Sequence, residues 1–108
     1  MPITREFRET VQARAQSDVR FRRAMLTEAI NELLAGELET GKALLRDYVN
    51  ATLGFDCLQE QTGLPSKSLQ RMLGPRGNPT AESLFAIIKA VQQAEHITLS
   101  VKPTRSAA

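Results

Sequence analysis

The chain has 108 residues, a formal net charge of +2 at pH 7 and an apolar share of 42%. This length fits a single domain with a modest core, and the small net charge excludes a histone-like polycation, although a mildly basic domain can still bind DNA through clustered charge. One cysteine and one histidine exclude an intramolecular disulfide and a structural zinc site, so no metal and no cofactor are expected.

No stretch approaches the roughly 20 apolar residues of a membrane span, and the N-terminus has no apolar signal-peptide core. We therefore expect no membrane association and a cytoplasmic, reducing setting, in which Cys57 is a small buried residue. An enzyme is not expected, because Cys57 and His96 lie on different predicted elements and the chain has no glycine-rich phosphate loop.

Residues 1–40 are predicted to form a helical extension that can bind a partner. A first helix, from Ile3 to about Gln16, has a thin apolar stripe and is expected to pack weakly or against a partner. Ser17-Asp18 offers an N-cap for an amphipathic helix that runs to Ala35, where Gly36 ends it. These helices carry four arginines, for which we favour a charged outer face over a contact to an acidic partner surface or a second phosphate-contacting patch: Arg14, Arg20, Arg22 and Arg23.

Residues 41–101 are predicted to form a second, mainly helical unit. Thr40 is expected to cap a helix from Gly41 to Leu53, which Gly54 ends. Two short helices follow, Phe55–Thr62 and Ser66–Leu73, and the turn between them at Gly63 requires a left-handed backbone that glycine adopts freely. After a loop over residues 74–79, Thr80 caps a last helix that reaches about Ala94.

The last predicted element is a short strand, because Ile97, Leu99 and Val101 alternate with Thr98 and Ser100. A single strand cannot satisfy its own backbone groups, so these three apolar residues are predicted to pair with the same strand of a second copy and form a homodimer. The alternative is a frayed extended segment. Residues 102–108 are predicted to be a disordered tail.

The two short helices have the pattern of a helix-turn-helix. Leu58, Leu64, Leu69 and Met72 supply the buried side, which leaves a polar and cationic side that suits the DNA major groove. Arg and Lys suit guanine and Gln suits adenine, whereas residues in the following loop are better placed for phosphate. The candidate DNA-binding residues are therefore Ser66, Lys67, Ser68, Gln70, Arg71, Arg76 and Asn78.

From about Leu45 to Val101 the chain resembles the lambda-repressor (XRE-like) class of helix-turn-helix regulators, and within it the addiction-module antidote proteins, the HigA-like antitoxins. The residues that carry this resemblance are Leu58–Leu73, Gly77-Asn78-Pro79-Thr80 and the helix Leu84–Lys89. The resemblance implies an all-α, lambda-repressor-like bundle that binds DNA as a dimer. It also implies a toxin partner that the antidote neutralises, and repression of the pair's own promoter.

The chain departs from this class at Gln59, where a small residue is usual at the contact between the two motif helices. A glutamine there must point outward or be hydrogen-bonded, because an unpaired buried amide is costly.

The sequence therefore predicts a DNA-binding transcriptional regulator, the antitoxin of a type II toxin–antitoxin module that represses its own promoter as a homodimer on double-stranded DNA. The alternatives are a stand-alone helix-turn-helix regulator without a toxin, and a protein-interaction module of the same fold.

Overall fold

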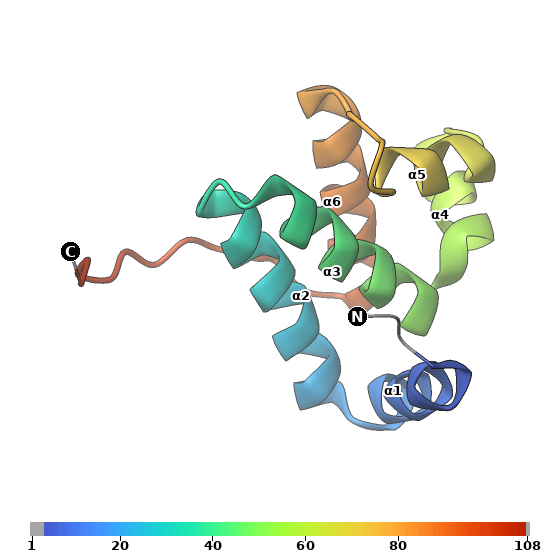
Figure 1. Ribbon diagram of the computed structural model, residues 1–108, viewed down its shortest axis with the longest axis horizontal. Helices are drawn as coiled ribbons and strands as arrows, with labels where there is room; N and C mark the ends of the chain where they lie inside the picture. Colours follow the sequence, from blue (N-terminus) through green and yellow to red (C-terminus); the bar gives the residue numbers. More distant parts are fainter. Residues whose placement is uncertain (1–3, 108) are drawn as a thin grey trace.

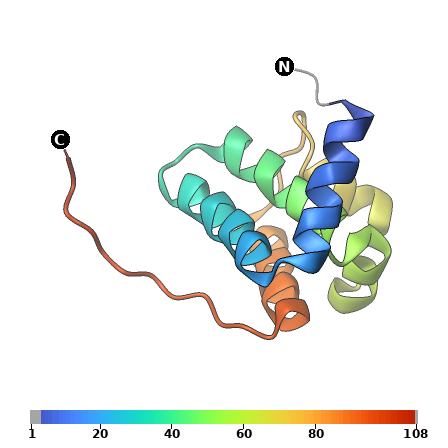
Figure 2. The same ribbon diagram turned by 90° about the horizontal axis from the view of Figure 1, so that it is seen from below.

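The computed structural model describes residues 4–107, and within them the chain is all-α with no strand (Figure 1). The helices are α1 (Arg5–Ser17), α2 (Val19–Leu34), α3 (Leu38–Ala51), α4 (Gly54–Thr62), α5 (Ser66–Met72) and α6 (Ala81–Glu95). In both views α4 and α5 lie on the opposite side of the molecule from the extended C-terminal residues (Figures 1 and 2).

In three of the helices the residue directly before the helix caps it with its own side chain, and two of these caps were predicted. The Asp18 carboxylate accepts a hydrogen bond from the Phe21 N–H at 3.1 Å at the start of α2. Thr80 Oγ1 accepts one from the Ser83 N–H at 3.1 Å at the start of α6. Thr4 caps α1 in the same way, and the predicted start of that helix at Ile3 lies outside the described residues. Each cap satisfies a backbone donor that the first turn of a helix leaves unpaired.

The predicted Thr40 cap is wrong, because α3 already begins at Leu38, after Glu37, whose side chain makes no capping bond. Gly41 therefore lies inside the first turns of α3. A Cβ there would stand only 2.5 Å from Leu33 Cδ2, so the glycine allows α2 and α3 to approach closely. The tight pairing of these helices, rather than the local cap signal, sets where α3 starts.

A single hydrophobic core connects α2 to α6. It consists of Leu26, Ala29, Leu45, Tyr48, Val49, Phe55, Leu58, Leu69, Leu73, Ile87, Ala90 and Val91. The predicted division at residue 40 is consequently not a structural boundary: it falls within α3, and α2 contributes Leu26 and Ala29 to the same core as the later helices. Only α1 is peripheral to this core, with Ala15 as its one buried residue.

The predicted strand over residues 97–101 is not formed in the described single chain. His96 ends α6 in the left-handed region, with φ 59°, and the Ile97 N–H that follows donates to the Gln92 carbonyl at 3.1 Å. The Leu99 N–H then donates to Gln92 Oε1 at 2.7 Å, and Ile97 and Leu99 pack against the core. The alternation of apolar residues therefore reflects packing on this chain's own core. Val101 is 74% exposed, and residues 102–107 are exposed without regular structure.

Candidate nucleic-acid interface

The turn between α4 and α5 has the predicted backbone geometry. Gly63 has φ 78°, in the left-handed region, and its N–H donates to the Gln59 carbonyl at 2.8 Å. On the inner side of the turn, Leu58 of α4 and Leu69 of α5 are fully buried. Burial of a leucine side chain contributes about 1.5–3 kcal/mol, so these two residues fix α5 on α4 and leave its other face outward.

Gln59 both points outward and is hydrogen-bonded, as expected for a glutamine at the contact between the two helices. Its side chain is exposed, and its Oε1 accepts a hydrogen bond from the Ser66 N–H at 2.7 Å. Pro65, the residue before α5, makes no side-chain cap of its own. The amide of Gln59 therefore caps α5 from the preceding helix and links the two helices across the turn.

The outward face of α5 carries the predicted DNA-binding side chains. Lys67, Gln70 and Arg71 are exposed, while Ser66 and Ser68 are half-buried. Gln70 Nε2 donates to Ser66 Oγ at 3.1 Å, which aligns the two side chains along the helix. The structure thus gathers these five residues on one short helix, whose exposed face is polar and cationic.

Arg76 and Asn78, the other predicted DNA-binding residues, are exposed in the loop that follows α5. This loop folds back tightly, since a Cβ on Gly77 would collide with the carbonyl oxygens of Arg71 and Met72. The Gly77 N–H donates to the Gly74 carbonyl at 3.0 Å. The loop therefore begins against the end of α5 and carries both side chains beside it.

Sequence reasoning missed Lys42, which lies under this loop and is 1% exposed. Its Nζ donates to the carbonyls of Gly77 at 2.6 Å and Gly74 at 3.2 Å. A signal was present in the sequence: Lys42 lies at helical spacing from Leu38, Leu45 and Val49, so it occupies a position on the apolar face of α3.

The four N-terminal arginines do not act as one patch. Arg22 Nε pairs with the Glu95 carboxylate at 2.7 Å, and its Nη1 donates to the Ala15 carbonyl at 2.9 Å. Arg14 stacks its guanidinium over Phe21, 4.6 Å from the ring centroid. Arg20 and Arg23 are exposed. The favoured charged outer face is therefore correct for Arg20 and Arg23 and also for Arg14, whose side chain is exposed, but it is wrong for Arg22, which joins α1, α2 and α6.

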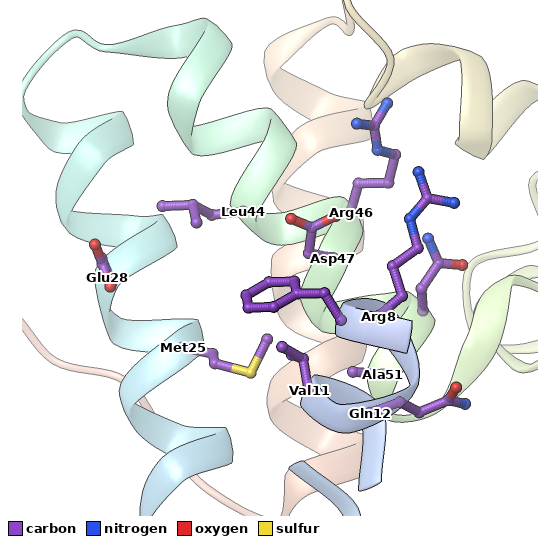
Figure 3. Close-up of a pocket in the computed structure, with 11 residues that line it drawn as sticks. Arg8, Val11, Gln12, Met25, Glu28, Leu44, Arg46, Asp47 and Ala51 are labelled. Carbon is purple, nitrogen blue, oxygen red and sulfur yellow. The ribbon is translucent and has the colours of Figure 1, made fainter. Parts of the chain in front are cut away.

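A groove of about 790 Å³ lies between α1, α2 and α3. Figure 3 shows Val11 and Met25 pointing into it, with the guanidinium groups of Arg8 and Arg46 directed away. Phe7, on the same side of α1 as Val11, is 56% exposed. Burial raises the pKa of the Asp47 carboxyl in this groove, and the nearby charges of Arg46 and Arg8 oppose the rise.

Within residues 4–107 no group of His, Cys, Asp and Glu side chains is arranged to hold a metal ion. None of the helices described is long and apolar enough to cross a membrane. Comparison of the chain with family models, with curated proteins and with solved structures found no match.

Proposed function

We propose that this protein is a sequence-specific DNA-binding transcriptional regulator. The observation that carries the proposal is the outward face of α5, where Lys67, Gln70 and Arg71 are exposed on a helix anchored from within by Leu69. In this proposal α5 enters the major groove and its long polar side chains reach base edges, while Arg76 and Asn78 contact phosphates.

The first experiment measures binding of the protein to its own upstream DNA and to unrelated DNA, by fluorescence anisotropy over a salt series. Tight, salt-sensitive binding that prefers the upstream fragment is expected, because base contacts add to an electrostatic, sequence-independent attraction. Weak and equal binding to both fragments would overturn the proposal that this protein is a transcriptional regulator.

A charge-reversed variant identifies the interface. Lys67→Glu with Arg71→Glu is expected to lower the affinity for upstream DNA by at least about 100-fold, because two favourable contacts become repulsive. The matched control is Arg20→Glu with Arg23→Glu, which makes the same charge change at exposed positions on α2. Equal losses in both variants would show a general charge effect and remove α5 from the interface.

The proposal extends to an antitoxin that represses its own promoter as a homodimer and neutralises a toxin. Its support is the resemblance of residues 45–101 to addiction-module antidote proteins. The proposed dimer contact comprises Ile97, Leu99 and Val101, of which Val101 is exposed in the single chain.

The groove between α1, α2 and α3 favours a protein partner, in keeping with a toxin and also with an interaction module that does not bind DNA. Phe7→Ser, at a half-exposed position on its rim, is expected to weaken capture of the neighbouring gene's product and to leave DNA affinity unchanged. Pull-down after co-expression measures the first effect. Unchanged capture by this variant would exclude the groove as the partner site.

A further inference from the structure

Lys42 is the one polar or charged residue, among those the structure describes, that is almost completely buried. Besides its bonds to the Gly74 and Gly77 carbonyls, its Nζ pairs with Glu39 Oε1 at 2.9 Å. An ammonium group has three N–H donors, and each of them has an acceptor here. The charge is therefore fully accommodated, by one exposed carboxylate and two carbonyls that lie more than thirty positions away in the sequence.

Burial of a lysine is a costly way to fill space, since an apolar side chain of similar size packs without desolvating a charge. Unlike an apolar side chain, the ammonium makes directional hydrogen bonds, and these connect α3 to two defined points of the loop after α5. Those two points, Gly74 and Gly77, bracket Pro75 and Arg76.

The same loop is constrained from its other side by the end of α5. The Gly74 N–H donates to the Arg71 carbonyl at 3.1 Å, and Gly77 has no room for a Cβ against that carbonyl. Arg76 lies between the two anchored glycines, and Asn78 directly follows the second. Both side chains are exposed while the backbone that carries them is held from beneath.

We infer that Lys42 is a positioning residue for DNA binding: from inside the fold it holds the loop so that Arg76 and Asn78 face the phosphates beside the site read by α5. This inference rests on the proposed function. Lys42 itself touches no DNA, because its ammonium is enclosed by the loop.

The first test needs no DNA. Lys42→Met removes the ammonium and keeps an unbranched side chain, and Lys89→Met makes the same change at an exposed position on α6. Tryptic cleavage after Arg76, followed by mass spectrometry, is expected to accelerate at least about tenfold in Lys42→Met and to stay unchanged in Lys89→Met. Cleavage after Arg105, in the exposed C-terminal residues, is the internal reference. Unchanged cleavage after Arg76 would overturn the inference.

The second test is a double-mutant cycle in the anisotropy assay. Lys42→Met is expected to weaken binding to upstream and unrelated DNA alike, by about tenfold, and to lower the salt slope by about one. In an Arg76→Gln background, Lys42→Met is expected to lower the DNA affinity by less than about threefold, because the phosphate contact that Lys42 positions is already lost. Fully additive effects would overturn the inference, since a general loss of stability does not depend on Arg76.

Circular dichroism at the assay temperature establishes that each variant is folded. If Lys42→Met is unfolded, Lys42→Arg takes its place in both tests, since it keeps the charge but presents a bulkier, planar donor group. If the wild-type protein binds no DNA, the proposed function fails, and the positioning role fails with it. The cleavage result then still decides whether Lys42 holds the loop.

Discussion

At the scale of single residues, α5 and the loop that follows it are held by side chains from other helices. Gln59 caps α5 although it belongs to α4, and Lys42 of α3 supports the loop after α5. Gln59 accepts from an N–H that the start of a helix leaves unpaired, and Lys42 donates to two carbonyls of the loop. The position of the exposed face of α5 is thus determined by contacts with the preceding helices.

Gln59→Ala removes the cap of α5 and is expected to lower the free energy of unfolding by about 0.5–2 kcal/mol, the usual cost of a lost helix cap. If α5 is the DNA-binding helix that we propose, Gln59→Ala is also expected to lower the DNA affinity, because the start of α5 becomes less ordered. Urea denaturation checks the stability. Gln61→Ala, at an exposed position on the same helix, is the control, and equal costs in the two variants would argue against the cap.

Tyr48 is the chain's single tyrosine, so its titration can be followed without interference. Burial, aided by the charge of Glu95, raises the pKa of its phenol to about 12 from an ordinary 10.0. The folded state therefore holds this proton more tightly than the unfolded state. The contribution of the Tyr48 proton to the free energy of unfolding is fully present below pH 10.0 and is lost as the pH rises through about 12.

The tyrosinate absorbance of the folded protein is expected to appear with a midpoint near pH 12, and that of the urea-unfolded protein near pH 10.0. Glu95→Gln is expected to lower the folded midpoint, since it removes a negative charge that opposes ionisation. Coincident midpoints in the folded and unfolded protein would contradict the burial of this phenol.

At the scale of the elements, α1 differs from the other helices. It buries Ala15 alone, while Arg22 bonds to its last turn through the Ala15 carbonyl. Its remaining apolar contacts line the groove on α2 and α3. Few buried contacts mean that opening of α1 costs less free energy than opening of the core.

Amide hydrogen exchange measures this difference directly. The amides of residues 9–15 in α1 are expected to exchange at least about tenfold faster than those of residues 45–49 in α3, whose apolar side chains form the core. A partner bound in the groove is expected to slow exchange in α1. Equal protection of the two helices in the free protein would show that α1 is an integral part of the core.

At the scale of the whole molecule, α5 and the C-terminal end of the chain lie on opposite sides (Figure 1). Ile97 and Leu99 already pack on this chain's core and donate their N–H groups to Gln92, which leaves Val101 as the exposed apolar side chain of this segment for a second copy.

Val101→Asp is accordingly expected to weaken the proposed homodimer by at least about tenfold while changing the stability of the single chain by less than about 0.5 kcal/mol, as is usual for an exposed position. Analytical ultracentrifugation measures the first effect and urea denaturation at low concentration the second. A dimer that is unaffected by this change would place the contact elsewhere.

The sequence by itself determined the helical class, the caps at Asp18 and Thr80 and the left-handed turn at Gly63, because each depends on residues within a few positions of one another. It also predicted that Gln59 would point outward or be hydrogen-bonded, but not that the Ser66 N–H would be its donor. The tertiary structure decided the start of α3, the packing of Ile97 and Leu99 on the core, the burial of Lys42 and the pairing of Arg22 with Glu95. These features depend on contacts between residues distant in the chain, which local periodicity does not encode.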